Sequence, residues 1–179
     1  MIANNKKAWY SIIVWPNGTL SKETVVSVKT YGALREAKPK AIIVYCLDPR
    51  FQEALAAFIS GELKLSYGEF IPLVIAGGAS VLARPDECEV DFCFAMGQID
   101  FLFSHFPSVE EVILISHEDC GRVGEKEPQS KADLRSASAN IKSHLSWPLS
   151  AIIETKLYYA SFSAIEAVPL TKLQPVAVA

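Results

Sequence analysis

Short apolar runs alternate with segments of helical periodicity along the middle of the chain. The runs are bounded by turn residues and predict buried strands at residues 41–45, 70–76, 112–115 and 157–162, the last as an edge strand. The segments between them predict helices at residues 49–61, 86–106 and 132–145. Because strands that alternate with helices imply crossover connections, we expect an α/β fold. Its form should be a three-layer α/β/α domain with a mainly parallel central sheet of four to five strands.

The helix predicted at residues 86–106 shows the clearest pattern. Asp86-Glu87-Cys88-Glu89 has the spacing of a capping box, so we expect the helix to open there. Its apolar residues recur at steps of three and four and predict one face packed in the core. These residues are Phe92, Met96, Ile99, Phe103 and Phe106.

Composition and charge narrow the class of protein. The 179 residues are about half apolar and show no linker or repeat, so we expect a single domain over 1–179 with an N-terminal extension over 1–38. Its aromatic residues Trp9, Tyr10 and Trp15 are candidates for packing on a partner subunit, with packing on their own chain as the alternative. With 17 basic residues scattered among 20 acidic ones, nucleic acid is not an expected partner. No apolar stretch reaches the ~20 residues of a membrane span, and the apolar run after Lys6-Lys7 lacks a small-residue cleavage site, so we expect a cytoplasmic protein.

Two short motifs, each directly after a predicted strand, carry the candidate chemistry. They are Cys46-Leu47-Asp48-Pro49-Arg50 and His117-Glu118-Asp119-Cys120-Gly121. Parallel strands bring their carboxyl ends to the same edge of a sheet, which brings the two motifs together. Cys46, His117 and Cys120 then offer two thiolates and one imidazole, which predicts a tetrahedral zinc site with one position left for water. The alternatives are a cysteine that only fills the core, a His117 that only caps a turn, and a Cys46–Cys120 disulfide.

Asp48 and Arg50 are the candidate catalytic pair. A zinc ion neutralised by two thiolates acidifies its water only moderately, so a nearby group must orient the resulting hydroxide or accept its hydrogen bond. Asp48 is placed for this role, and Arg50 can keep it ionised and fix its rotamer. The alternative is a surface ion pair worth ~0 to 1 kcal/mol, with Asp48 as the N-cap of the following helix.

Other cysteines and glycines have simpler interpretations. Cys88 and Cys93 are five residues apart and do not share a helical face, so we expect core or boundary thiols rather than a second metal site. Gly77-Gly78 predicts a tight turn, with an anion cradle as the alternative.

Together, Cys-x-Asp-x-Arg and His-x-x-Cys-Gly resemble the β-class carbonic anhydrase family over residues 39–121. Gly77-Gly78 is similar to the Ala-Gly turn of that family. The resemblance implies that Cys46, His117 and Cys120 bind Zn²⁺, that Asp48 accepts from zinc-bound hydroxide or transiently ligates the metal, and that Arg50 is its partner. The implied activity is a zinc lyase that reversibly hydrates CO₂ to bicarbonate. Dimers or multiples of dimers, with active sites at subunit interfaces, are implied as well.

The chain departs from the family pattern at two places. Pro39 keeps its spacing, but Ala37 stands where the family has Gln, and Val74-Ile75 stand where it has Arg-Asn. Zinc binding is compatible with these changes, whereas efficient CO₂ hydration is less so. The alternatives are hydrolysis of CS₂ or COS on the same fold, a catalytically weak zinc-binding homologue with a binding or structural role, and a metal-free Rossmann-like binding domain.

Overall fold

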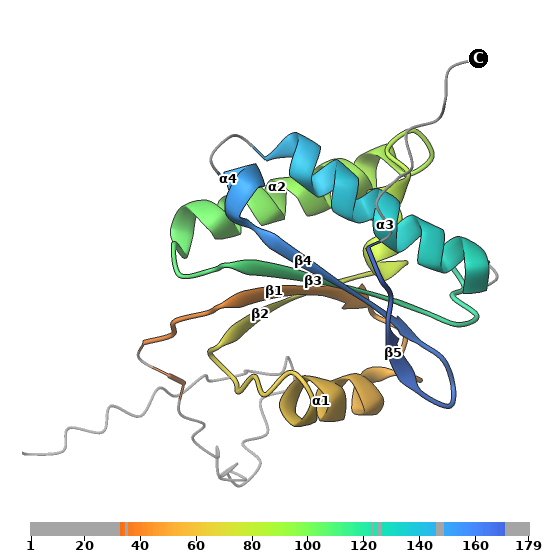
Figure 1. Cartoon of the computed structure of the whole chain (residues 1–179), viewed down its shortest axis with the longest axis horizontal. Coiled ribbons are helices and arrows are strands. Elements are labelled where there is room, and N and C mark those ends of the chain that lie inside the picture. Colours follow the sequence, from red (N-terminus) through yellow and green to blue (C-terminus); the bar gives the residue numbers. More distant parts are fainter. Residues whose placement is uncertain (1–32, 35, 123, 125–126, 146–148, 171–179) are drawn as a thin grey trace, which may run out of the picture. The chain divides into compact units, whose positions relative to one another are not determined.

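A five-stranded sheet in the order β2-β1-β3-β4-β5 forms the centre of the protein (Figure 1). The computed structural model describes residues 33–170 except 35, 123, 125–126 and 146–148. The strands are β1 Ala41–Cys46, β2 Phe70–Ile75, β3 Glu111–His117, β4 Glu154–Ala160 and β5 Ile165–Ala167. The first four are parallel and β5 is antiparallel to β4, so the mainly parallel sheet is confirmed.

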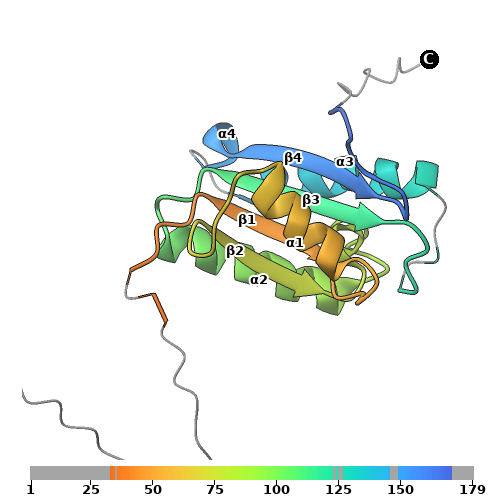
Figure 2. The same ribbon diagram turned by 90° about the horizontal axis from the view of Figure 1, so that it is seen from below.

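The helices lie on both faces of this sheet (Figures 1 and 2). They are α1 Gln52–Gly61, the 3₁₀ helix η1 Gly78–Ala83, α2 Glu89–His105, α3 Glu127–His144 and α4 Leu149–Ile152. The step from β1 to β2 runs one way along the sheet, and the steps to β3 and then β4 run the other way. Because such crossovers are right-handed, α1 covers one face while α2 and α3 cover the opposite one. This confirms the three-layer α/β/α architecture.

Alternating residues of the central strands divide the core into two layers. Ile42 and Val44 of β1 pack toward α2 and α3, whereas Ile43 packs toward α1. In α2 the predicted apolar face is found in the core: Met96, Ile99 and Phe103 are buried, and Phe92 and Phe106 pack against them.

Three predictions about the ends or positions of elements were wrong. The helix predicted at 132–145 begins earlier, at Glu127. Residues 86–89 do not form a capping box, because α2 begins only at Glu89, and its N-cap Cys88 makes no side-chain capping bond. Glu87 instead pairs with Arg84, at 3.2 Å. The strand predicted at 157–162 is found as β4, but its predicted edge position is wrong, because β4 lies between β3 and β5 and the short β5 takes the edge.

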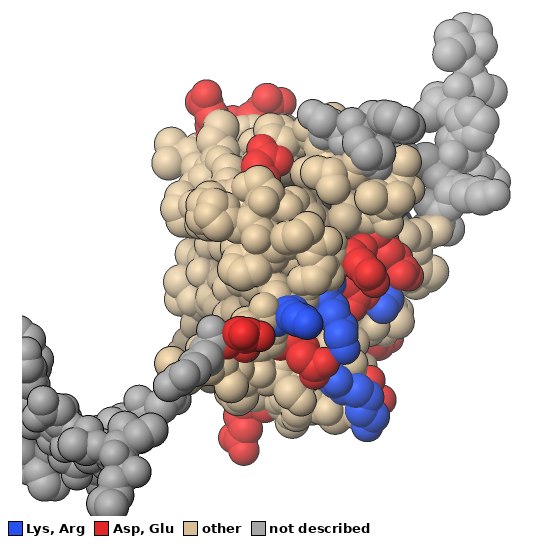
Figure 3. Space-filling view, turned by 90° about the vertical axis from the view of Figure 1, so that its left-hand side faces the viewer, with Lys and Arg blue, Asp and Glu red and all other residues tan. Residues whose placement is uncertain are grey.

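Little of the expected N-terminal extension is within the described residues, which begin at position 33. From Leu34 onward the chain forms one compact unit. Within the described part, no helix is both long and apolar enough to cross a membrane. On the face drawn in Figure 3, Lys and Arg lie among Asp and Glu rather than in a stripe.

Candidate metal centre

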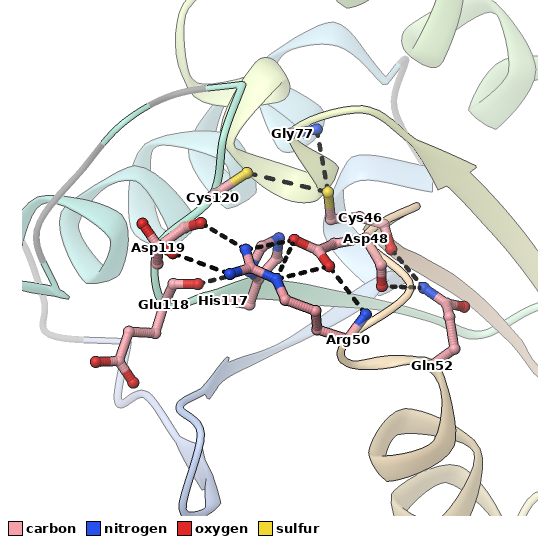
Figure 4. Close-up of polar contacts among 9 residues, drawn as sticks. All are labelled: Cys46, Asp48, Arg50, Gln52, Gly77, His117, Glu118, Asp119 and Cys120. Atoms are coloured by element: carbon pink, nitrogen blue, oxygen red, sulfur yellow. Dashed lines mark hydrogen bonds and ion pairs between the residues drawn. The ribbon is translucent and has the colours of Figure 1, made fainter.

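Cys46, His117 and Cys120 come together at one edge of the sheet (Figure 4). Cys46 is the last residue of β1, His117 is the last residue of β3, and Cys120 follows in the next loop. β1 and β3 are parallel neighbours. From β1 the sheet is extended first to β2 on one side and then to β3 on the other, so the order in which strands are added reverses between β1 and β3. Such a switch point is where open α/β sheets form ligand sites, so the sequence-based placement of the two motifs is confirmed.

Two backbone turns in left-handed conformations build this edge. Asp119 has φ 53°, which turns the chain between His117 and Cys120 and is tolerated by Asp better than by most residues. Gly78 has φ 55°, and a Cβ there would lie 2.7 Å from the backbone nitrogen of Cys46. Gly77 has φ 88° and donates its N–H to Cys46 Sγ at 3.4 Å. Gly77-Gly78 is therefore a tight turn packed against the end of β1.

The three side chains fit a zinc ion. Their ligand atoms lie within 4.8 Å of one another and all three residues are buried. Two sulfurs at ~2.3 Å from a tetrahedral zinc would be about 3.8 Å apart; the Cys46 and Cys120 sulfurs are 4.0 Å apart. Both thiols are free, so no disulfide joins them.

His117 presents one ring nitrogen as a ligand. Nδ1 lies 2.8 Å from the Glu118 carbonyl oxygen, which can only accept, so Nδ1 carries the proton. Nε2 then keeps its lone pair, yet it is buried and makes no hydrogen bond among the described residues. A buried nitrogen left unsatisfied costs free energy, and a metal ion in the cluster would remove that cost.

Hydrogen bonding favours the metal-binding form of Cys46. The pKa of Cys46 is lowered to about 4, first by its hydrogen bond with Cys120. Burial opposes this shift, and the nearby His117 imidazole and the backbone around Asp48 and Gly77 add to it. A thiolate is the form of cysteine that binds metal.

Asp48 and Arg50 form a bidentate ion pair beside the cluster. Arg50 Nη2 donates to Asp48 Oδ2 at 2.7 Å, and Nε donates to Oδ1 at 3.0 Å. The backbone N–H of Arg50 also donates to Oδ1, at 2.9 Å. These bonds to Arg50 lower the pKa of Asp48 to about 2, so the carboxylate is ionised at neutral pH. The alternative role as a helix N-cap is not found, because α1 has Phe51 at its N-cap and no side-chain capping bond.

The fold of the chain is similar to that of solved carbonic anhydrases. The enzyme from Streptococcus mutans aligns with a TM-score of 0.52 at 16% identity, over 79% of this chain and 88% of that one. The enzyme from Glaciozyma antarctica aligns with a TM-score of 0.51 at 16% identity, over 76% and 85%. The β-carbonic anhydrase isoform I of Trichomonas vaginalis gives 0.49 at 14% identity, over 78% and 87%.

The chain has the β-carbonic anhydrase fold. No protein-family model and no curated protein sequence matches it. At these identities the likeness concerns the fold, and the chemistry must be argued from the residues themselves.

Two of the three residues that depart from the β-carbonic anhydrase pattern, Val74 and Ile75, lie near the cluster, whereas Ala37 precedes β1 and lies at the other end of that strand from Cys46. Ala37 is exposed, and Val74 is 41% exposed on the edge strand β2. Ile75 is half-buried and directly precedes Ala76 and Gly77, which line a cavity of about 360 Å³. The other residues that line this cavity are Cys46, Leu47, Asp48, Pro49, Arg50, Cys120, Gly121 and Arg122.

Two residues that support this site, Asp119 and Gln52, were missed from sequence. Arg50 Nη1 donates to Asp119 Oδ2 and Nη2 to the Asp119 carbonyl oxygen, both at 2.9 Å. Gln52 Nε2 donates to the carbonyl oxygens of Cys46 and Asp48, at 3.0 and 2.9 Å. Asp119 could have been suspected because it lies inside the His-x-x-Cys motif. Gln52 binds only backbone atoms, and no sequence pattern indicates that.

Proposed function

We propose that this protein is a zinc-dependent lyase that reversibly hydrates CO₂ to bicarbonate. The observation that carries the proposal is the buried Cys46–His117–Cys120 cluster beside the Asp48–Arg50 pair on a β-carbonic anhydrase fold. Cys46 Sγ, Cys120 Sγ and His117 Nε2 would hold the Zn²⁺. When bound there, the metal supplies acidification of a water molecule, which makes water nucleophilic near neutral pH.

Asp48 orients the attacking water. Its carboxylate is ionised and only 13% exposed, and Arg50 holds it through a bidentate ion pair. A carboxylate oxygen in this state accepts a hydrogen bond from the water and directs the water lone pair toward the carbon of the substrate. Through the bonds of this ion pair Arg50 fixes the geometry of the Asp48 carboxylate and keeps it ionised. Asp119 in turn holds the Arg50 guanidinium.

The cavity beside the cluster suits a small uncharged substrate. Its volume is about 360 Å³, and Leu47, Pro49, Ala76 and backbone atoms of glycines make much of its wall. The charges of Asp48 and Arg50 neutralise each other, so the pair does not favour binding of an ion. CO₂ is small, linear and uncharged, and the charge of Arg122, which also lines the cavity, is paired with Asp91 at 2.6 Å.

Apolar residues at three positions favour a second candidate, a zinc-binding protein with weak or no hydration activity. Val74 and Ile75 offer no polar group next to the Ala76–Gly77 turn, and Ala37 offers none on its own segment. CS₂ or COS hydrolysis on the same fold is the third possibility, since each is another small uncharged carbon electrophile.

Stopped-flow measurement of CO₂ hydration by the zinc-loaded protein tests the proposal. We expect a rate well above that of buffer, and a large loss of that rate in Asp48→Asn. Absence of a rate above buffer with one zinc bound per chain would overturn the lyase assignment and support the zinc-binding candidate. Sulfide release from CS₂ or COS, without CO₂ hydration, would support the hydrolase instead.

We also propose a cytoplasmic homodimer or higher homo-oligomer formed by a single domain, with residues 1–38 as an extension that packs on a partner subunit. The outer face of α2 supports association, because Val90, Phe94 and Phe101 are 81%, 55% and 50% exposed. Light scattering after size exclusion should give at least twice the mass of the chain, and Phe94→Asp should reduce it. A monomeric wild-type protein would contradict this part of the proposal.

A further inference from the structure

The loop between β4 and β5, residues 161–164, lies beside the candidate metal centre. Ala160 at the end of β4 is the ladder partner of His117 at the end of β3. The loop is closed by the N–H of Ser161, which donates to the Ala164 carbonyl oxygen at 2.8 Å. It therefore begins next to a proposed zinc ligand and has a defined conformation.

Phe162 extends from this loop toward the residues that support the site. Its N–H donates to Glu118 Oε2 at 3.1 Å. Its ring centroid lies 5.2 Å from that of Phe51, and the Phe51 ring lies 4.5 Å from the imidazole of His117. The Arg50 guanidinium carbon lies 5.4 Å from the centre of the Phe162 ring. One side chain thus contacts both the arginine of the proposed catalytic pair and the aromatic residue that packs on His117.

The Phe162 ring adds a π contact to the Arg50 guanidinium, whose side chain is still 44% exposed and whose carbon also lies 6.0 Å from the centre of the Phe51 ring. The Nε, Nη1 and Nη2 atoms of Arg50 already donate to Asp48 and Asp119. Hydrogen bonds of this kind lie in the guanidinium plane, whereas an aromatic ring is attracted to the cation through its π face. Phe162 therefore restrains Arg50 through a contact that the carboxylates do not provide.

Because Phe162 is exposed, its effect on Arg50 can be tested without unfolding the protein. The residue is 61% exposed, and its ring is not part of either buried core cluster. A large apolar side chain that remains this exposed buries little surface, so its truncation should cost little stability.

We propose that Phe162 is a positioning residue for the Arg50 guanidinium and, through Phe51, for the imidazole of His117. Its effect on turnover rests on the proposed function, whereas its effect on Arg50 does not. Cation–π contacts at exposed sites are modest, so we expect Phe162→Leu to lower kcat for CO₂ hydration about two- to fivefold. Phe162→Tyr, which keeps the ring, should restore the wild-type rate.

The direct test is the NMR signal of the Arg50 Nε–H in the zinc-loaded full chain, assigned with Arg50→Lys. Phe162→Leu should shift this signal, because the ring current is lost, and should speed its exchange with water. Phe162→Tyr should leave it near its wild-type position. Tyr67→Leu is the matched control, since Tyr67 is an 86% exposed aromatic residue outside the site, and its replacement should change neither signal nor rate.

An unchanged Arg50 signal and exchange rate in Phe162→Leu, in a protein that remains folded by circular dichroism, would overturn the positioning role. If the wild-type protein hydrates no CO₂, the proposed function fails, and the Arg50 signal still decides the role of Phe162. If the wild-type protein hydrates CO₂ and its turnover falls equally in Phe162→Leu and Phe162→Tyr, the aromatic contact is not the cause of the loss. The positioning role is then wrong.

Discussion

The sulfur atoms of Cys46 and Cys120 lie 4.0 Å apart although 74 positions separate the two residues in the sequence. The parallel pairing of β1 and β3 creates this proximity, because it places the ends of both strands at one edge. The left-handed turn at Asp119 then returns Cys120 toward Cys46. The metal centre is thus produced by sheet topology together with one turn.

Removal of one thiol should abolish zinc binding. Cys120→Ala leaves one thiolate and one imidazole, too few protein ligands for a stable site. We expect about one zinc per chain in the wild-type protein and less than about a tenth of that in the variant, measured by inductively coupled plasma mass spectrometry. Cys93→Ala is the control, since Cys93 is exposed and outside the cluster, and it should retain full zinc. Equal zinc in Cys120→Ala and the wild type would refute the ligand assignment.

Arg50 should determine the titration of Asp48. Its hydrogen bonds hold the pKa of Asp48 at about 2, below the usual value of about 4. In Arg50→Gln the pKa should rise toward the usual value, which ¹³C NMR of the Asp48 carboxylate would detect. The ionised pair stabilises the folded state above pH ~4, and this contribution is lost as the pH falls toward ~2.

The stability of the same two proteins gives an independent check on the Asp48–Arg50 pair. Urea unfolding between pH 4 and pH 2 should show a smaller loss of the free energy of unfolding in Arg50→Gln than in the wild type. The reason is that the pKa of Asp48 in the variant lies closer to its value in the unfolded chain. An identical Asp48 titration in both proteins would show that the ion pair does not hold the carboxylate.

The sequence was sufficient for the four parallel strands and for the three proposed ligands, because hydrophobic runs indicate burial and the residues after parallel strands meet at one end of the sheet. It did not predict the short β5, which takes the edge beside β4. It was insufficient for the start of α2, since Asp86 and Glu89 have the spacing of a capping box while Glu87 is attracted to Arg84. The contribution of Phe162 could not be predicted either. Its neighbours Arg50 and Phe51 are more than a hundred positions away, and an exposed phenylalanine in a loop carries no pattern.

Gly78 should be intolerant of any side chain. A Cβ at this position would lie 2.7 Å from the backbone nitrogen of Cys46, and φ 55° is itself unfavourable for alanine. We expect Gly78→Ala to lower the free energy of unfolding by more than about 2 kcal/mol and to weaken zinc binding, because the end of β1 must move.

Gly97 in α2 provides the matched control for Gly78. A Cβ at this helical position would have no described atom within 4 Å beyond its own helix backbone and chain neighbours. Gly97→Ala should therefore raise the free energy of unfolding by up to about 1 kcal/mol through helix propensity. Urea unfolding of both variants measures the contrast. Equal stabilities for Gly78→Ala and Gly97→Ala would show that the Gly77-Gly78 turn does not constrain Cys46.

The measurement that tests the metal centre most directly is zinc-edge X-ray absorption of the zinc-loaded full chain. We predict two sulfur ligands at about 2.3 Å, one histidine nitrogen at about 2.0–2.1 Å and one further oxygen ligand. A first shell without sulfur, with only one sulfur, or closed by a third sulfur would contradict the assignment of Cys46, His117 and Cys120 as the zinc site.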